Sequence, residues 1–196
     1  MARRSLLLGA LALASGITSA LFNNATDICR DIESKISDGS DVFYPCKFRK
    51  PRVNPRSLAN PSQVIHPLHY TDATTHWFLS SNGKAACVVE AGSAEDVSLA
   101  LQTIAASRTP FAVYSGGHAS NPGFSSTEGV HISLGRLNQV ALSPDKSIVT
   151  LGFGQGWTDV YDALEDSGVN VVGGRVPGPG MGGFTLGGGY SWYESA

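Results

Sequence analysis

The sequence lacks a tract of basic residues, and its charge is not biased strongly toward either sign. Fourteen Lys and Arg residues accompany sixteen Asp and Glu residues, which gives a formal net charge of −2. Electrostatic binding to a nucleic-acid backbone or to an anionic membrane surface depends on clustered positive charge. We therefore expect neither nucleic acid nor a membrane among the partners of this chain.

An apolar run long enough to span a bilayer is also missing. The N-terminal stretch Leu6–Leu13 is too short for a transmembrane helix. It follows Arg3 and Arg4 and precedes Thr18-Ser19-Ala20, which is the pattern of a secretory signal peptide. We prefer this interpretation to a membrane anchor, and we predict a signal peptide at residues 1–20 and a secreted, extracellular protein.

Cysteine is scarce, with three residues in the chain. The oxidising environment of an exported protein permits a disulfide, and Cys29 and Cys46 lie close together in the polar region after the signal peptide. We predict that these two cysteines pair. Cys87 lies within an apolar run, where a free cysteine behaves as a small buried hydrophobe and a reactive thiol is disfavoured. Asn24 begins an N-x-T pattern that predicts a glycosylation site.

Common patterns for metal binding and nucleophilic catalysis are absent. The sequence has no G-x-S-x-G elbow, no P-loop and no H-E-x-x-H pair. His66, His69 and His76 could suggest a metal cluster, but they lie in a segment broken by prolines, without a regular helix to carry ligands. We assign them surface or packing roles and predict no metal site. His131 alternates along an expected strand and is interpreted as structural.

Regular structure is expected mainly after residue 82. Five prolines between Pro45 and Pro67 interrupt the preceding segment, so residues 21–82 are predicted to form an irregular arm. Further along, Ser93 and Asp96 have the spacing of a capping box at the start of a helix. Apolar runs and periodicity predict strands at 87–91, 111–115, 130–134, 140–142, 148–151 and 169–172, and helices at 94–107 and 157–167.

The order of these elements indicates an α+β fold. Residues 87–115 form a strand, a helix and a second strand within about thirty residues, which is the length of one βαβ unit with parallel strands. Several strands then follow in succession, and this pattern is more typical of an α+β fold than of a doubly wound sheet.

Glycine is abundant, at 23 residues, and two glycine turns stand out. Residues 115–119 follow an expected strand, and residues 178–183 formally match the dinucleotide fingerprint G-x-G-x-x-G. A Rossmann site is disfavoured, because Gly187-Gly188-Gly189 follows where a helix is required and no acidic residue lies about twenty positions further on. Backbone N–H groups of two glycine turns can still bind the two charges of a pyrophosphate. Ordinary tight turns remain the alternative.

The first glycine turn and its surroundings resemble a known family. Ser115-Gly116-Gly117-His118, followed by Asn121-Pro122-Gly123-Phe124-Ser125, is similar to the flavin-attachment loop of secreted FAD-linked oxidases. These are the berberine-bridge-enzyme-like members of the vanillyl-alcohol-oxidase superfamily, which has a PCMH-type FAD-binding domain. The resemblance covers about residues 85–192, with further matching segments in the family's order at 87–90, 152–157 and 180–190.

This resemblance implies that residues 83–196 form a PCMH-type FAD-binding domain, with a βαβ unit and a mixed sheet, and that the cofactor is FAD. It also implies that His118 is joined covalently to the 8α-methyl group of the flavin, a role that suits the nucleophilic neutral imidazole. A core histidine satisfied by hydrogen bonds is the alternative. The residues that the resemblance places at the cofactor are Ser115, Gly116, Gly117, His118, Ala119, Gly123, Pro177, Gly178, Gly180, Gly182, Gly183, Gly187 and Gly188.

Two features depart from the family pattern. Val176 stands where many relatives carry a cysteine that forms a second bond to the flavin, so we expect attachment through His118 alone. The family's FAD domain continues into a substrate domain that supplies the catalytic base, whereas this sequence stops at Ala196. We therefore expect an N-terminal fragment, truncated before its second subdomain is complete, in which no catalytic residue is identifiable.

Two functions remain open from the sequence. The first is a secreted oxidase that passes a hydride from a small-molecule substrate to covalently held flavin and then to O2, releasing H2O2. The second is a truncated FAD-binding module or an inactive gene fragment without turnover. A secreted binding module without flavin is a more remote third alternative.

Overall fold

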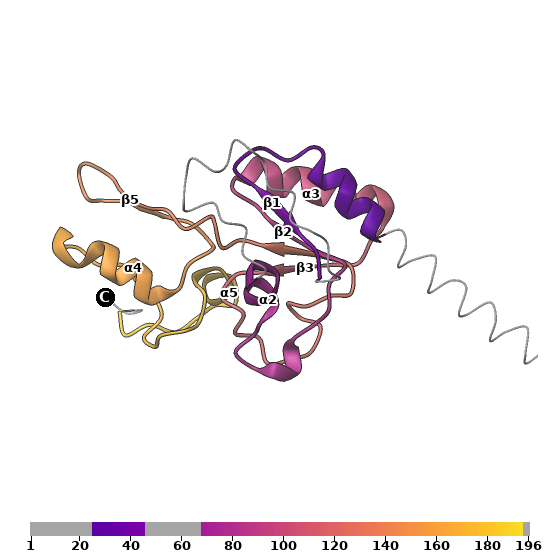
Figure 1. Ribbon diagram of the computed structural model, residues 1–196. Helices are drawn as coiled ribbons and strands as arrows, with labels where there is room; N and C mark the ends of the chain where they lie inside the picture. The colour runs from indigo at the N-terminus through magenta and orange to yellow at the C-terminus, as the bar shows by residue number, and fades with distance from the viewer. Residues whose placement is uncertain (1–24, 46–67, 194–196) are drawn as a thin grey trace, which may run out of the picture.

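The computed structural model describes residues 25–45 and 68–193 (Figure 1). The predicted signal peptide, the Asn24 pattern, Cys46 and His66 lie outside these residues. In chain order the elements are a helix at 25–33, β1 (Asp41–Phe43), α2 (Leu68–Thr74), the 3-10 turn η3 (Leu79–Ser81), β2 (Cys87–Glu90), α3 (Ala94–Ser107), β3 (Phe111–Tyr114), β4 (Val130–Ser133), β5 (Val140–Leu142), β6 (Val149–Leu151), α4 (Trp157–Leu164), the 3-10 turn η4 (Glu165–Ser167) and α5 (Met181–Leu186).

Four strands form the main sheet in the order β1-β2-β4-β3. Strands β2 and β3 both pair in parallel with β4, and β1 pairs with β2 in the antiparallel direction. The predicted βαβ unit is therefore present as β2-α3-β3. However, β4 lies between its two strands, so the sheet is mixed and β2 and β3 do not pair directly.

One face of the sheet is covered by two helices, and the other face by α2 (Figure 1). Successive side chains of a strand point to opposite faces. On β4, Val130 and Ile132 accordingly pack in a core with residues of α3 and of the 25–33 helix. His131, between them, is also buried and lies on the opposite face with α2. The pattern makes β4 the most deeply buried strand of the sheet.

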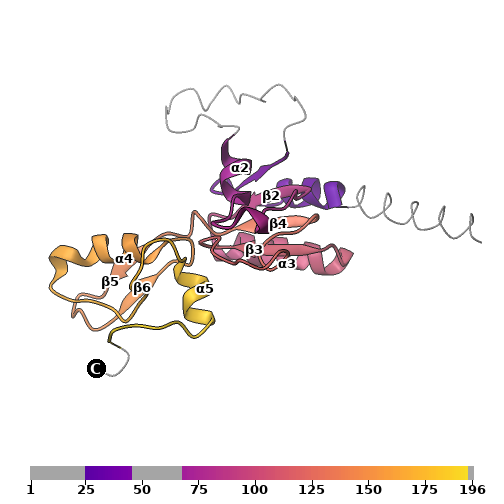
Figure 2. The same ribbon diagram turned by 90° about the horizontal axis from the view of Figure 1, so that it is seen from below.

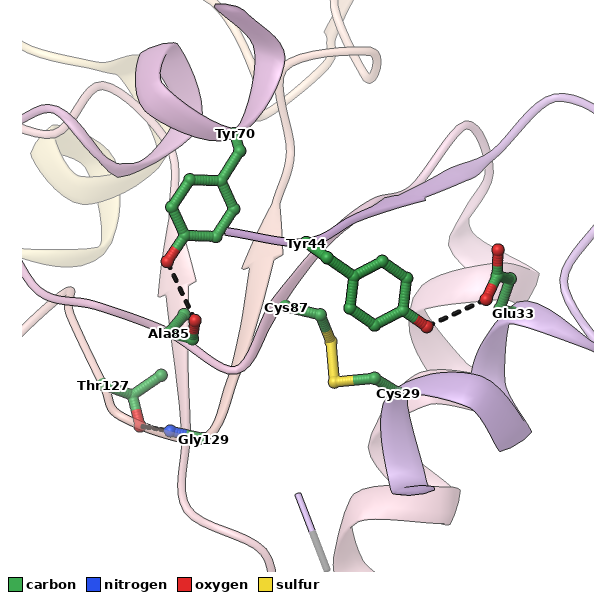
Figure 3. The surroundings of a disulfide bond; sticks show 8 residues. All are labelled: Cys29, Glu33, Tyr44, Tyr70, Ala85, Cys87, Thr127 and Gly129. Atoms are coloured by element: carbon green, nitrogen blue, oxygen red, sulfur yellow. Dashed lines mark hydrogen bonds between the residues drawn. A yellow bond between two sulfur atoms is a disulfide. The ribbon is translucent and has the colours of Figure 1, made fainter. Parts of the chain in front are cut away.

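The disulfide joins Cys29 to Cys87, so the predicted pairing of Cys29 with Cys46 is wrong. Figure 3 shows this bond between the 25–33 helix and strand β2. The two Cα atoms lie 6.1 Å apart, within the range that a disulfide spans. Cys87 is buried as expected, but it is bonded and not free. Proximity in sequence was misleading because the helix packs directly on the strand that carries Cys87.

Asp96 joins the start of α3 to the loop before β1. The Ser93 hydroxyl accepts a hydrogen bond from the backbone N–H of Asp96 at 3.1 Å, as the capping pattern predicts. The Asp96 carboxylate also accepts hydrogen bonds from the hydroxyls of Ser37, Ser40 and Ser93 and from the backbone N–H of Ser37. These bonds, led by those from Ser37, hold the pKa of Asp96 well below its usual range.

A smaller lobe, residues 135–193, contains the β5–β6 hairpin, α4 and α5 (Figure 2). Trp157, Val160 and Leu164 line one side of α4 and pack with Met181 of α5. Gly168 ends the turn after α4 with a left-handed φ of 75°, a conformation that favours glycine at the end of a helix. We call the remaining described residues, 25–45 and 68–134, the main lobe.

Three expectations about local structure differ from the fold. The predicted irregular arm contains the 25–33 helix, β1 and α2. The predicted strand at 169–172 is not formed. The glycine-rich end does form a helix, α5, because Phe184 packs edge-on against the Trp157 ring at 5.2 Å and tertiary contacts of this kind stabilise short helices. Among the described residues, no helix is long and apolar enough to cross a membrane.

Candidate functional site

The two predicted glycine turns lie against each other at the junction of the lobes. A Cβ atom added to Gly116 would collide with the backbone of Gly180, and one added to Gly180 would collide with the backbone of Gly116. The hydroxyl of Ser115 donates a hydrogen bond of 2.5 Å to the carbonyl of Phe153 in the small lobe. Glycine is therefore required at both positions because the two backbones touch.

The first turn owes its shape to Gly117 and Tyr114. Strand β3 ends at Tyr114, whose ring lies under the turn and would collide with a Cβ atom at Gly117. Gly117 has a φ of 63°, which side chains other than hydrogen disfavour. The Tyr114 hydroxyl donates a 2.7 Å hydrogen bond to the Thr75 carbonyl, so the segment after α2 supports the turn from below.

The two turns enclose one side of a cavity of about 450 Å³, a volume within the range of small-molecule sites. The predicted cofactor residues that line it are Ser115, Gly116, Gly117, His118, Ala119, Gly180, Gly182 and Gly183. The predicted residues that do not line it are Gly123, Pro177, Gly178, Gly187 and Gly188. Two further lining residues, Ser125 and Pro179, belong to the motifs noted in the sequence but were not assigned to the cofactor. The remaining lining residues, which the sequence did not indicate, are Val113, Leu134, Phe153, Phe184 and Leu186.

The His118 imidazole forms part of the cavity wall and lies among aromatic rings. The Trp77 ring stacks on it, with centroids 5.3 Å apart and planes 16° from parallel. The Phe78 ring meets it edge-on at 6.1 Å. Gly178, although it does not line the cavity, lies beside this imidazole: a Cβ atom there would be 3.6 Å from Nε2. The second glycine turn thus reaches the histidine of the first.

Behind the first turn lies a buried pair of histidines. His76 Nε2 lies 2.7 Å from the hydroxyl of Ser125, and its Nδ1 lies 3.1 Å from the Thr74 carbonyl. His131 is 1% exposed, and its Nε2 has no hydrogen-bond partner among the described residues. The pKa of His131 is lowered to about 4, chiefly by burial and to a smaller extent by the neighbouring His76, against an opposing hydrogen bond with the Ala73 backbone. His131 is therefore neutral at pH 7.

The cavity offers backbone donors and apolar surface. Within the described part of the chain, His118 is the only ionisable side chain that lines it, and no Lys or Arg does. Backbone N–H groups of the two turns can then supply donors for an anionic group. Gly183 faces open space in the wall, with nothing within 4 Å of an added Cβ atom, whereas Phe153 and Leu186 supply apolar contacts. This lining fits a dinucleotide with a pyrophosphate and a flat, largely apolar ring.

The described residues contain no group of three His, Cys, Asp or Glu side chains that could hold a metal ion. His66 and the side chain of His69, which were considered with His76 for such a site, lie outside the described part. His76 itself is buried and hydrogen-bonded, a packing role.

Sequence comparison identifies relatives with named activities. The chain is 44% identical over 119 residues to the FAD-dependent monooxygenase yanF of Aspergillus niger, covering 60% of this chain and 20% of that protein. It is 46% identical over 140 residues to a FAD-dependent monooxygenase of Arthrobotrys oligospora, covering 70% and 27%. A third such enzyme, from Fusarium proliferatum, is 31% identical over 95% of this chain and 34% of its own length. The chain thus spans only a fifth to a third of these relatives.

Structural comparison supports the same fold. Physcomitrella patens BBE-like 1 matches with a TM-score of 0.61 at 17% identity, over 81% of this chain and 30% of that one. The glucooligosaccharide oxidase of Acremonium strictum, described with a 6-S-cysteinyl, 8α-N1-histidyl FAD, matches with a TM-score of 0.55 at 25% identity. That match covers 63% of this chain and 26% of the oxidase.

A sequence profile described as "FAD binding domain" matches residues 85–195, which is more than half of the chain. The match includes both glycine turns and every residue that lines the cavity. The α+β fold class and the PCMH-type FAD-binding domain expected from the sequence are confirmed. The chain belongs to the FAD binding domain family, and its cofactor is FAD.

Proposed function

We propose that this protein is a FAD-dependent oxidoreductase that holds its cofactor between the two glycine turns, with His118 bonded covalently to the flavin. The observation that carries the proposal is the contact between Gly116 and Gly180, which brings both turns and His118 to one cavity. The curated relatives are named FAD-dependent monooxygenases, which supports an oxidoreductase.

The residues of this chain would bind and orient the cofactor. Backbone N–H groups of the two turns would donate hydrogen bonds to the pyrophosphate oxygens, since no Lys or Arg side chain lines the described cavity. Phe153, Phe184 and Leu186 would exclude water from the flavin ring. His118 would supply the ring nitrogen for attachment at the flavin 8α position. Val176 stands where the family resemblance places a second attachment cysteine, and valine cannot form that bond. A single bond is therefore proposed, in contrast to the two named for the Acremonium oxidase.

When bound, FAD would supply the redox chemistry, which is acceptance of a hydride from the substrate and transfer of the electrons to O2 to give H2O2. We propose this oxidase reaction, on a small-molecule substrate, for the whole protein. Secretion, inferred from the N-terminal pattern, belongs to the same proposal. A covalent bond to His118 would prevent loss of the cofactor outside the cell.

The second candidate is a FAD-binding module without turnover of its own. It is favoured by the absence, within the described cavity wall, of any carboxylate, lysine or tyrosine that could serve as a base for substrate oxidation. His118 is the single ionisable side chain there, and it is assigned to attachment.

Flavin attachment can be tested directly on the purified chain. The wild type and a His118→Ala variant are incubated with FAD, denatured and precipitated, and the pellets are examined for flavin absorbance and for a flavin adduct on the His118 peptide. We expect the adduct in the wild type alone, with reversible FAD binding retained in His118→Ala. A wild-type chain that neither binds FAD nor acquires an adduct would refute the proposal.

The two candidate functions differ in turnover. We expect the loaded protein to release H2O2 with at least one member of a panel of alcohols, sugars and aromatic secondary metabolites. As a control, the attached flavin is reduced chemically and its reoxidation by O2 is followed. If this flavin reacts normally but none of the compounds yields H2O2, the result would favour the module without turnover.

A further inference from the structure

Trp77 is a large aromatic side chain that remains 70% exposed although it lies beside an apolar cavity. One face of its indole is covered by the His118 imidazole, with the rings 16° from parallel, and Phe78 meets the same imidazole edge-on. Contacts of these geometries attract aromatic rings and set their relative orientation. Exposed as it is, Trp77 makes a specific contact with His118, the one ionisable side chain among the described residues of the cavity wall.

The backbone around Trp77 is fixed to the turn that carries His118. The N–H of Trp77 donates a 3.0 Å hydrogen bond to the Gly117 carbonyl, next to His118 in sequence. The carbonyl of Thr75 accepts a hydrogen bond from the hydroxyl of Tyr114, the residue before the turn. The Nε2 atom of His76 lies 2.7 Å from the hydroxyl of Ser125, which follows the turn. Segment 75–77 thus contacts residues before, within and after the turn, which holds the indole over the imidazole.

Within the described residues, no hydrogen bond holds the His118 ring, so its rotamer depends on the two aromatic rings. We propose that Trp77 is a positioning residue that orients the His118 imidazole for covalent attachment of FAD. This inference rests on the proposed function, because it concerns the attachment assigned to His118 there. Stacking on Trp77 restricts rotation of the imidazole within the cavity wall, which raises the fraction of encounters that lead to a bond.

The attachment that Trp77 assists is chemically balanced. One C–H bond at the flavin 8α carbon and one imidazole N–H bond are replaced by a C–N bond. The two hydrogens and the electron pair are retained by the flavin, which is thereby reduced, and O2 then accepts them as H2O2. Orientation of the imidazole nitrogen toward the 8α carbon is required only in the bond-forming step, so loss of Trp77 should affect attachment more than reversible FAD binding.

The test compares Trp77→Ala, Trp77→Phe and a control, Leu79→Ala, in the full chain. Leu79 is also exposed, at 77%, and does not line the cavity. The rate of adduct formation on the His118 peptide is measured at saturating FAD. We expect Trp77→Ala to slow attachment about tenfold, an effect of the size of one aromatic contact. Trp77→Phe should restore most of the rate, Leu79→Ala should match the wild type, and the affinity for reversibly bound FAD should change less than twofold.

A second measurement needs no flavin. Because the indole stacks on the imidazole, ring currents should shift the His118 ring protons upfield in NMR spectra of the cofactor-free chain; the signals are assigned by their loss in His118→Ala. The shift should disappear in Trp77→Ala and persist in part in Trp77→Phe. Normal attachment in Trp77→Ala, with the wild type also labelled, would overturn this inference and leave the proposed function intact. Absence of any adduct in the wild type would instead overturn the proposed attachment, and this inference with it.

Discussion

At the residue scale, the candidate site depends on two glycines whose backbones touch. The space between Gly116 and Gly180 admits no side chain on either residue, and neither backbone can yield without separating the lobes. Gly183 lies in the same cavity wall but has open space around it. A substitution at Gly116 therefore tests the contact between the two turns, whereas a substitution at Gly183 tests the cavity alone.

We expect Gly116→Ala to lower the free energy of unfolding by about 1–3 kcal/mol, the usual cost of forcing extra volume into a packed contact, and to abolish FAD binding. Gly183→Ala should leave stability unchanged or raise it by up to about 1 kcal/mol, because alanine favours helix and Gly183 lies in α5. It should still weaken FAD binding, since its methyl group enters the cavity. Urea unfolding and FAD titration provide both measurements. Equal stability of Gly116→Ala and wild type would contradict the turn contact.

The buried His131 predicts a pH dependence of stability. Its pKa is lowered to about 4 in the folded protein, chiefly by burial, whereas an unfolded histidine titrates near its ordinary value of about 6.5. Between these values the unfolded state binds the additional proton, so the stability is fully present above pH 6.5 and is lost as the pH falls toward 4. The slope contributed by this one group is at most about 1.4 kcal/mol per pH unit.

This dependence can be isolated with a His131→Asn variant, which removes the titrating ring. We expect the free energy of unfolding of the wild type to fall faster than that of the variant between pH 6.5 and 4, with parallel curves above pH 7. Other histidines and carboxylates titrate in both proteins, so the difference between the curves reports His131. Curves that stay parallel down to pH 4 would show that His131 is not buried in the neutral form.

Much of the site at this scale could be predicted from the sequence, because the motif around His118 is contiguous. The glycine spacing also identified Gly180 and its neighbours. Leu134 and Phe153 could not be predicted, since each reaches the cavity from the end of a different segment and carries no local signal. Trp77 was missed for the same reason: it lies in a segment predicted to be irregular, and only the fold brings it to His118.

At the scale of elements, helix α3 is joined to the chain before β1 through one carboxylate. Asp96 → Asn should lower the free energy of unfolding by about 1–3 kcal/mol, because an amide cannot accept all the hydrogen bonds that Ser37, Ser40 and Ser93 donate. The lowered pKa of Asp96 also predicts that this stability is present above the ordinary carboxylate range and is lost in strong acid. The measurement is thermal unfolding of Asp96→Asn. The control is Glu95→Gln, which makes the same kind of change at an exposed neighbour in the same helical turn.

The disulfide fixes the 25–33 helix to the sheet and closes a separation of 58 residues. We expect a Cys29→Ser, Cys87→Ser double variant to lose up to about 4 kcal/mol of stability, the value that chain entropy gives for a loop of this length. Cys46→Ser should have little effect, since Cys29 is bonded elsewhere. Peptide mapping without reductant provides an independent check, and recovery of a Cys29–Cys46 peptide would contradict the observed pairing.

Sequence patterns located most strands and both long helices of the domain but not their arrangement. The pattern at 130–134 predicted a strand, yet the insertion of β4 between β2 and β3 depends on contacts far apart in sequence. The disulfide error has the same origin. Helix α5 was not predicted because its glycines have low helix propensity, and packing of Phe184 on Trp157 overrides that propensity.

At the scale of the whole molecule, the cavity is shared by two lobes with separate cores. One core lies between the main sheet and its helices, and the other surrounds Trp157. The contacts that join the lobes include the hydrogen bond from Ser115 to Phe153 and the Gly116–Gly180 contact at the cavity. Away from the cavity, Arg136 of the small lobe donates hydrogen bonds to the carboxylates of Glu90 and Asp41 in the main lobe. A cofactor that contacts both turns should therefore couple the two lobes.

We expect FAD to raise the melting temperature of both lobes together. A ligand at a hundredfold excess over its Kd stabilises the folded state by about 2.7 kcal/mol. Hydrogen exchange with and without FAD should show increased protection in β3 and in α5, which belong to different lobes. The Ser115→Ala variant lacks one hydrogen bond between the lobes. Its thermal unfolding transition should therefore be broadened more in the absence of FAD than in its presence. Protection confined to one lobe would contradict a shared site.

The exposed indole of Trp77 has a consequence for how the molecule can be observed. Its emission overlaps the near-ultraviolet and blue absorption bands of isoalloxazine, so resonance energy transfer should quench it as the cavity fills. Trp157 is buried in the other core, where its ring packs on Phe184 of the cavity wall, and Trp192 lies near Arg175. An intrinsic chromophore thus stacks on the His118 imidazole of the cavity wall, and occupancy of the cavity can be followed optically without adding a dye or altering the covalent structure.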